Sequence, residues 1–268
     1  MSVNNSKHKA RKRFGQNFLQ DQGIIRHIVA SIRPQAGEQL VEIGPGLGAI
    51  TEHLLAATGS LDVVELDRDL IPHLRISFAT YGNNLRIHEA DALKFDFTQI
   101  NDAEKSMRVV GNLPYNISTP LIFHLLEHAE QIIDMHFMLQ KEVVLRLAAG
   151  PGDNNYGRLS IMAQYYCAVE NLFEVPPEAF DPRPKVDSAI VRLMPYDTLP
   201  HVADNFKDFE NLVKQAFSQR RKTLRNNLKG LVSAEELEQL GIDAGLRPER
   251  LAVADYVKIS NYRQQQAQ

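Results

Sequence analysis

The sequence predicts an α/β fold, in which a doubly wound, mainly parallel sheet of about seven strands precedes a small all-α domain. Two features indicate this. From Gln39 to Met194, apolar runs typical of buried strands alternate with segments whose apolar residues recur at helical spacing. After Pro195 no strand-like run follows, and the apolar spacing is helical. We therefore expect a Rossmann-like domain over residues 1–195, with a basic tail at 1–20, and a helical domain over residues 196–268.

The strands are placed by their apolar and β-branched residues. They are expected at Gln39–Ile43, Leu61–Leu66, Leu85–His88, Met107–Val110, Ile132–Leu139, Ala168–Val175 and Asp187–Met194. A proline-rich link joins the last two strands without an obvious crossover helix, although a parallel connection normally contains one. An antiparallel pair is therefore expected at one edge of the sheet.

The helices of the first domain have recognisable ends. Asp21 can cap the first helix, which Pro34 closes. Ser118 can cap a later helix that runs through His128. Further helices are expected over residues 49–58, 68–79, 140–149 and 157–166.

The C-terminal domain also carries helix signals. Apolar residues recur on one face of a helix that begins near Phe209. Ser233 and Glu236 form a capping-box pattern, and Gly241 is placed to end that short helix. A final helix is expected over residues 253–262.

Composition is typical of a globular cytoplasmic enzyme. The chain has 268 residues, of which 44% are hydrophobic and 24% charged, enough for one large domain or a medium and a small one. No apolar run approaches 18 residues, and the polar, basic N-terminus is unlike a secretory signal. A single cysteine, Cys167, excludes an internal disulfide and a cysteine-rich zinc site. We expect a reducing, cytoplasmic location.

The net charge of −3 argues against a nucleic-acid partner, but the charges are unevenly distributed. No acid precedes Asp21, and none lies between Asn211 and Gly230, where the bases are numerous. Lys214, Arg221 and Arg225 are spaced to share one helix face. Either basic run could be merely solvated; together they favour an RNA or DNA backbone as partner. The candidate contacts are Arg11, Lys12, Arg13, Lys214, Arg220, Arg221, Lys222 and Arg225.

A glycine-rich turn follows the first strand of the sheet, where α/β folds bind nucleotide cofactors. Gly44, Gly46 and Gly48 are spaced Gly-x-Gly-x-Gly, unlike the Gly-x-Gly-x-x-Gly fingerprint of dinucleotide binders. The acidic Glu42 beside the turn tolerates the cationic groups of S-adenosylmethionine, which has no phosphate. The alternative is a tight strand-to-helix turn that binds no ligand.

Two further strand ends carry ligand-type acids. Glu65 ends the second strand, where a carboxylate can accept both hydroxyls of a ribose, and Asp67 could share or take over that role. Asp91 follows the third strand and is placed to accept a hydrogen bond from an adenine amine. Each acid alone could be an ordinary surface residue, but acids at the ends of successive strands favour a cofactor site.

The run Asn112-Leu113-Pro114-Tyr115 predicts a clamp for the N6 amine of adenine. That amine is a poor nucleophile because its lone pair is delocalised into the ring. The side-chain oxygen of Asn112 and the carbonyl of Leu113 can accept its two N–H groups, which localises the lone pair. Pro114 stiffens the turn without a competing N–H, and Tyr115 can stack on an extruded base. The alternative is a polar turn with a buried tyrosine.

These motifs closely resemble those of the bacterial small-subunit (16S) ribosomal RNA adenine N6,N6-dimethyltransferase family, and the resemblance spans nearly the whole chain. It is carried by residues 11–19, 41–48, 65–67, 111–120, 136–146, 157–166, 180–191 and 219–228. The resemblance implies a seven-stranded class I methyltransferase domain with a helical C-terminal domain. It also implies dimethylation of two adjacent adenosines in the 3′-terminal hairpin of small-subunit RNA, late in subunit assembly.

The resemblance also assigns roles to residues. It implies that Gln16 and Asn17 close over the methionine end of S-adenosylmethionine, and that Phe180 faces the flipped adenine opposite Tyr115. The remaining cofactor contacts would be Leu19, Gly44, Gly46, Glu65, Asp91 and Asn112. The expected partner is the small ribosomal subunit, and the chain is expected to act as a monomer without a metal.

Three other hypotheses compete with this one. His124 and His128 lie four residues apart on a predicted helix, but no third metal ligand lies nearby in the sequence. A related adenine methyltransferase acting on large-subunit RNA or on DNA is the nearest rival among enzymes. A non-catalytic RNA-binding assembly factor with the same fold is the rival from another class, and the intact clamp argues against it.

Overall fold

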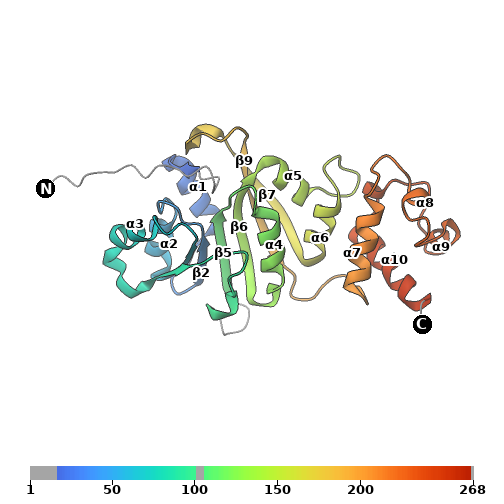
Figure 1. Ribbon diagram of the computed structural model, residues 1–268, viewed down its shortest axis with the longest axis horizontal. Coiled ribbons are helices and arrows are strands. Elements are labelled where there is room, and N and C mark those ends of the chain that lie inside the picture. The colour runs from blue at the N-terminus through green and yellow to red at the C-terminus, as the bar shows by residue number, and fades with distance from the viewer. Residues whose placement is uncertain (1–16, 101–105, 267–268) are drawn as a thin grey trace. The chain divides into compact units, whose positions relative to one another are not determined.

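The structure is a computed structural model that describes residues 17–100 and 106–266 (Figure 1). Its seven-stranded sheet has the order β4-β3-β2-β5-β6-β9-β7. The strands are β2 (Gln39–Ile43), β3 (Leu61–Glu65), β4 (Leu85–Glu89), β5 (Met107–Asn112), β6 (Ile132–Gln140), β7 (Cys167–Val175) and β9 (Ser188–Pro195). The predicted α/β class and every predicted strand are confirmed, with ends within a residue or two.

The strand directions follow the predicted pattern. The strands from β4 through β3, β2 and β5 to β6 are parallel, and β9 runs antiparallel to β6 beside the edge strand β7. Strands β3 and β4 lie on one side of β2 in the sheet, and the next strand in the sequence, β5, lies on the other side. The sheet therefore has its topological switch point between β2 and β5, where ligands bind at the carboxyl ends of strands.

Helices pack on this sheet through apolar faces. Side chains of α1 (Gln22–Ile32), α2 (Thr51–Thr58) and α3 (Ile71–Ser77) share one core cluster with strand residues. The buried side chains of α4 (Ser118–Leu126) lie outside that cluster, as expected if helices cover both faces of the sheet.

The first helix forms as predicted. The Asp21 carboxylate accepts hydrogen bonds from the N–H groups of Gly23 and Ile24, at 2.7 and 2.9 Å, and so caps α1. Arg33 adopts a left-handed conformation with φ of 50°, which ends the helix before Pro34.

Two helix predictions for this part of the chain need correction. Ser118 does not cap α4, because it is already the first helical residue, and its hydroxyl donates to the carbonyl of Tyr115 at 3.3 Å. Helix α3 is shorter than predicted, since the chain first makes a turn in which the N–H of Leu70 donates to the carbonyl of Asp67.

A second, two-stranded sheet was not predicted. Strand β1 (Phe18–Leu19) pairs antiparallel with β8 (Phe180–Asp181), so that Leu19 lies opposite Phe180. The N–H of Gln20 extends this pairing by donating to the carbonyl of Ala179 at 2.8 Å. This small sheet ties the segment that precedes α1 to the proline-rich link between β7 and β9.

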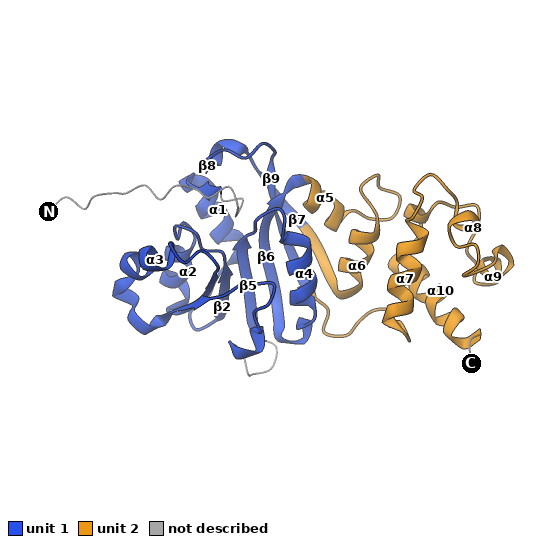
Figure 2. Ribbon diagram, viewed as in Figure 1, with its two compact units in different colours: residues 1–141, 171–194 blue, residues 142–170, 195–268 orange. Residues whose placement is uncertain are grey.

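The chain packs into two compact units (Figure 2). Unit 1 comprises residues 1–141 and 171–194, and unit 2 comprises residues 142–170 and 195–268. The sequence places a boundary between residues 195 and 196, and the chain passes from unit 1 to unit 2 between residues 194 and 195. Residues 142–170 nevertheless pack with the C-terminal helices, because α6 (Arg158–Tyr166) contacts α7 (Phe206–Ala216) and α10 (Val253–Gln266).

Unit 2 is mainly helical and has its own core. Besides α6, α7 and α10 it contains α8 (Leu224–Asn227), α9 (Ala234–Gln239) and nearly all of α5 (Lys141–Ala148). Tyr165 of α6 packs on Phe209 of α7 with ring centroids 4.8 Å apart. The predicted capping box is present, since Ser233 and Glu236 each bond the other's N–H. In the described parts of the chain, no helix has both the length and the apolar character needed to cross a membrane.

Candidate active site

A pocket in unit 1 opens at the carboxyl ends of β2, β3 and β5, at the switch point of the sheet. Every described residue that we predicted for the cofactor or the clamp lines it. These residues are Asn17, Leu19, Gly44, Gly46, Glu65, Asp91, Asn112, Leu113, Pro114, Tyr115 and Phe180. The remaining prediction for this site, Gln16, falls outside the described residues.

The glycine turn lies directly after β2. Gly44 and Gly46 have φ of +64° and +59°, a conformation that residues with a side chain rarely adopt. A Cβ on Gly46 would lie 3.3 Å from the ring of Phe18, so this glycine also lets β1 approach the turn. The N–H of Gly44 donates to the carbonyl of Val64 at 2.9 Å, which joins the turn to β3.

Glu65 ends β3 with its side chain buried in the pocket wall. Its Oε1 accepts the N–H of Asp67 at 2.8 Å, and its Oε2 accepts the N–H of Gly46 at 3.3 Å. Burial raises the pKa of this carboxyl, while these N–H groups act in the opposite direction. Each oxygen has a further lone pair, so the carboxylate can accept two more donors, such as the two hydroxyls of a ribose.

Glu42 lies within β2, next to the turn. Its Oε2 accepts the hydroxyl of Thr51 at 2.6 Å, and the side chain is almost entirely buried. Burial raises the pKa of Glu42 to about 7, against the effect of the Thr51 hydrogen bond and with a smaller contribution from the nearby Glu65. This carboxyl therefore changes its charge near neutral pH.

Asp91 follows β4 and is held by its own turn. Its Oδ1 accepts the N–H of Leu93 at 3.0 Å, and its carbonyl accepts the N–H of Lys94 at 2.9 Å. Asp67 is buried beside the pocket, and its Oδ1 accepts the N–H of Asp69 at 3.2 Å. Both carboxylates are thus oriented by the main chain before any ligand binds.

The charges of this pocket have one sign. The acids Glu42, Glu65, Asp67 and Asp91 line it, whereas no Lys, Arg or His is found among its described lining residues. Such a lining repels phosphate and favours a cation. A dinucleotide, whose pyrophosphate needs basic or N–H donors, therefore fits this pocket poorly.

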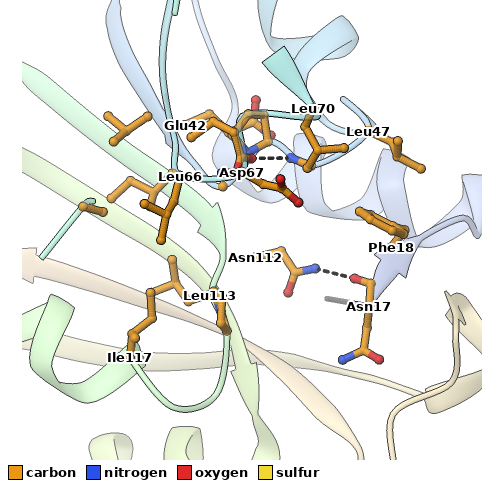
Figure 3. Close-up of a pocket in the computed structure, with 18 of the residues that line it drawn as sticks. Asn17, Phe18, Glu42, Leu47, Leu66, Asp67, Leu70, Asn112, Leu113 and Ile117 are labelled. Carbon is orange, nitrogen blue, oxygen red and sulfur yellow. Dashed lines mark hydrogen bonds between the residues drawn. The ribbon is translucent and has the colours of Figure 1, made fainter. Parts of the chain in front are cut away.

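Asn112 is the last residue of β5 and projects into the pocket (Figure 3). Its Nδ2 donates to the carbonyl of Asn17 at 3.2 Å, and this bond settles which way the amide faces. The side-chain oxygen is left as the acceptor. The neighbouring turn is closed by the N–H of Ile117, which donates to the carbonyl of Pro114 at 3.1 Å.

Two aromatic residues line the same pocket. Tyr115 is the last residue of the clamp, and its hydroxyl lies 3.2 Å from the hydroxyl of Ser188, at the start of β9. Phe180 is brought to the pocket by the pairing of β8 with β1. Sequence reasoning missed Phe18, Ser188 and this pairing, because two-residue strands leave no periodic pattern.

Comparison with known proteins identifies the family. The model of the family described as ribosomal RNA adenine dimethylase matches residues 7–265. The chain belongs to this family. The ribosomal RNA small subunit methyltransferase A of Saccharophagus degradans is 67% identical over 254 residues, covering 95% of this chain and 94% of the relative. The protein of the same name from Marinomonas sp. is 64% identical over 255 residues, covering 95% and 96%.

A solved structure agrees with this assignment. A dimethyladenosine transferase from Plasmodium falciparum is 28% identical, with a TM-score of 0.79, and the match covers 93% of this chain and 98% of that one. The predicted class I methyltransferase fold is therefore confirmed, as is the predicted enzyme class, ribosomal RNA adenine dimethyltransferase.

His124 and His128, the two candidate metal ligands, contact the main chain and each other in this dimethylase. A ring nitrogen of His124 lies 2.9 Å from the carbonyl of Phe95, and the rings of His124 and His128 meet edge to face. Within residues 17–100 and 106–266, no group of three His, Cys, Asp or Glu side chains could hold a metal ion.

The basic residues of unit 2 lie in a segment that we call the basic segment, residues 214–229. All of its lysines and arginines are exposed: Lys214, Arg220, Arg221, Lys222, Arg225 and Lys229. The prediction that Lys214, Arg221 and Arg225 share one helix face is wrong, because α7 ends at Ala216 and α8 begins only at Leu224. The other predicted RNA contacts, Arg11, Lys12 and Arg13, fall outside the described residues.

A buried asparagine organises the turn between these helices. Asn227 donates from Nδ2 to the carbonyls of Ala216 and Gln219, at 2.7 and 3.1 Å. Its own carbonyl accepts the side chain of Gln215 at 3.1 Å. Arg220, Arg221 and Lys222 therefore lie in an ordered turn between α7 and α8, whereas Lys214 and Arg225 lie on the two helices themselves.

Proposed function

We propose that this chain uses S-adenosylmethionine to dimethylate the N6 amines of two adjacent adenosines in the 3′-terminal hairpin of small-subunit ribosomal RNA, late in subunit assembly. One observation carries the proposal: a single pocket joins an acidic, phosphate-repelling cofactor wall to the oriented Asn112 amide. The names of the two bacterial relatives support the small subunit as the substrate.

The residues of the pocket fit this cofactor. Glu65 is already oriented by two N–H donors and would accept the ribose hydroxyls. Asp91 would accept the adenine amine. The Gly44 turn, Asn17 and the β1 residue Leu19 would enclose the methionine end, together with Gln16 of the N-terminal tail.

The electrostatics of the pocket also fit. When bound, S-adenosylmethionine supplies a methyl group on a cationic sulfonium that is already activated, so this chemistry requires no metal. The acidic lining stabilises positive charge, and buried charges interact more strongly than exposed ones because water screens them less.

The clamp residues act on the nucleophile. The side-chain oxygen of Asn112 accepts one N–H of the adenine amine, and the carbonyl of Leu113 accepts the other. Two acceptors favour a tetrahedral nitrogen whose lone pair is localised toward the methyl donor. Because the Asn112 amide is held by the Asn17 carbonyl, the acceptor is oriented before substrate arrives, which is how active sites reduce the cost of reorganisation.

The target adenine must leave its helix to reach this pocket. Tyr115 and Phe180 both line the pocket and supply aromatic surface on which the extruded base can stack. The monomethylated amine retains one N–H, so the same clamp can bind it for the second transfer.

The basic segment is the proposed anchor for the ribosomal RNA. Its exposed side chains would contact phosphates and fix register without reading sequence. The N-terminal residues Arg11, Lys12 and Arg13 would add to this contact. We further propose that the protein acts as a monomer in the cytoplasm.

A single experiment separates the proposal from its rivals. The protein is incubated with S-adenosylmethionine carrying a labelled methyl group and, in parallel, with under-methylated small subunits, large subunits or adenine-containing DNA. Label should enter small-subunit RNA as dimethyladenosine. Transfer to large subunits or DNA instead would identify a different substrate, and binding without any transfer would identify a non-catalytic factor.

A further inference from the structure

A hydrogen bond links the clamp to a distant strand. The Tyr115 hydroxyl lies 3.2 Å from the Ser188 hydroxyl, across 73 positions of sequence. Ser188 is the first residue of β9 and is about 1% exposed. Its main chain is fixed by the sheet, where it pairs with Gln140 of β6. The tyrosine hydroxyl is thus bound to one of the more rigid points near the pocket.

Ser188 itself does not line the pocket. Any effect of Ser188 on a bound base must therefore pass through Tyr115, which lines the pocket and is partly buried. A tyrosine ring has two soft torsions. Binding at the hydroxyl fixes the ring at the end opposite its Cα, so both torsions are restrained. Hydrogen bonds of unliganded active sites are often long and tighten when substrate binds.

The same segment of chain also carries the second aromatic residue of the pocket. The link between β7 and β9 contains Phe180, and it ends where Ser188 begins β9. Phe180 is held there by β8, which pairs with β1. The link therefore supplies one aromatic wall directly and fixes the other through the Ser188 hydroxyl.

We infer that Ser188 is a positioning residue for the methyl transfer, which holds the Tyr115 ring in the orientation that stacks on the target adenine. The inference rests on the proposed function for its substrate. It explains why the clamp ends in tyrosine, since phenylalanine would supply the same stacking surface but no group for Ser188 to hold.

The first test is a double-mutant cycle on methyl transfer to under-methylated small subunits at saturating S-adenosylmethionine. Ser188→Ala should lower kcat/KM for the subunit by ~3- to 10-fold, the value of one neutral hydrogen bond. Tyr115→Phe should lower it similarly. The double variant should be no worse than either single variant, because each change removes the same bond.

A control separates positioning from loss of structure. Thr58→Ala removes a buried hydroxyl of unit 1 that bonds only main-chain carbonyls and does not line the pocket. It should leave kcat/KM unchanged. Cofactor affinity, measured by calorimetry, should be the same in wild type and Ser188→Ala. Losses that multiply in the double variant, or a parallel loss of cofactor affinity in Ser188→Ala, would overturn the inference.

A second measurement needs no RNA. The chain has eight tyrosines, so 3-fluorotyrosine labelling gives a small set of ¹⁹F resonances, and Tyr115→Phe assigns one of them. Ser188→Ala should shift or broaden that resonance, and Thr58→Ala should not. An unchanged Tyr115 resonance would refute the role of Ser188. Absence of transfer by the wild-type protein would refute only the proposed substrate.

Discussion

The pocket of unit 1 and the basic segment of unit 2 are opposites in charge and in exposure. The pocket is lined by four carboxylates, three of which are buried, and its acids are oriented by N–H groups or a hydroxyl. The basic segment carries six lysines and arginines, all exposed. A net charge of −3 therefore describes neither region.

The difference separates two ways of using charge. Buried acids act on one small ligand at short range, where geometry decides the energy and salt has little effect. For exposed bases that bind a polyphosphate, the affinity depends on how many phosphates they contact, and salt weakens each contact. Changes in the pocket should therefore impair cofactor binding or chemistry and spare RNA binding. Changes in the basic segment should do the reverse.

The largest effect is expected from reversing three charges of the basic segment. Lys214→Glu, Arg221→Glu and Arg225→Glu together should weaken binding to immature small subunits roughly a hundredfold to a thousandfold at 0.1 M salt. Each phosphate contact contributes about 0.9 log units per tenfold change in salt, so the slope of log K against log salt should fall by about 3. A filter-binding titration over salt measures both quantities.

The matched control reverses three exposed bases elsewhere, namely Arg26, Arg75 and Lys207. It changes the net charge equally and should weaken binding far less. Affinity for S-adenosylmethionine should be unchanged in both variants. Normal binding by the basic-segment variant over the whole titration would make residues 7–13 the better candidate for the RNA anchor.

Asn112→Ala should give the next largest effect, on the chemical step. Single-turnover methylation should fall at least tenfold to a hundredfold, because an interaction made mainly in the transition state is lost. The rate must be measured at saturating cofactor, since Asn112 also bonds the Asn17 carbonyl beside the proposed cofactor site. Subunit binding should be normal at every salt concentration. A rate near that of wild type would eliminate the clamp.

Glu65→Ala should weaken S-adenosylmethionine binding by about 1.5–3 kcal/mol, the usual value of hydrogen bonds to a charged group. Calorimetry measures this directly. Because the carboxylate is buried, the loss should change little between low and high salt, in contrast to the basic-segment variant. Unchanged affinity would move the ribose role to Asp67.

The sequence was sufficient to place the sheet and most of the pocket. Strand β2 was predicted to the residue, because an apolar run stops abruptly at a glycine turn. The acids and the clamp could be placed as well, because each follows a strand and the carboxyl ends of parallel strands lie at one edge of a sheet. Their positions along the chain therefore predicted that Glu65, Asp91 and Asn112 would meet.

What the sequence did not predict depends on contacts between distant residues. The bonds from Asn112 to Asn17 and from Tyr115 to Ser188 span 95 and 73 positions, and nothing local signals them. The end of α7 was missed for a similar reason. Polar residues after Ala216 fit helical spacing, but the buried Asn227 takes the carbonyls of Ala216 and Gln219 and so supports a turn.

The last expected effect is on folding stability and concerns Glu42, an acid of the pocket whose charge changes near neutral pH. Glu42 has a pKa of about 7 in the folded protein, because it is buried, against an ordinary value of 4.5. Between these values the folded state binds more protons than the unfolded state, so the free energy of unfolding falls as pH rises. Below pH 4.5 and above about pH 7 this contribution is constant.

Glu42→Gln keeps an acceptor for the Thr51 hydroxyl and removes the titration. Relative to wild type, the variant should therefore gain stability between pH 5 and pH 8, by an amount on the order of 2 kcal/mol. Urea unfolding of both proteins at the two pH values, without cofactor, measures this difference, and the other titrating groups cancel. A difference that does not change with pH would mean that the Glu42 carboxyl already ionises normally in the folded protein. The pocket would then hold a permanent negative charge beside the glycine turn, and its contrast with the basic segment would be sharper still.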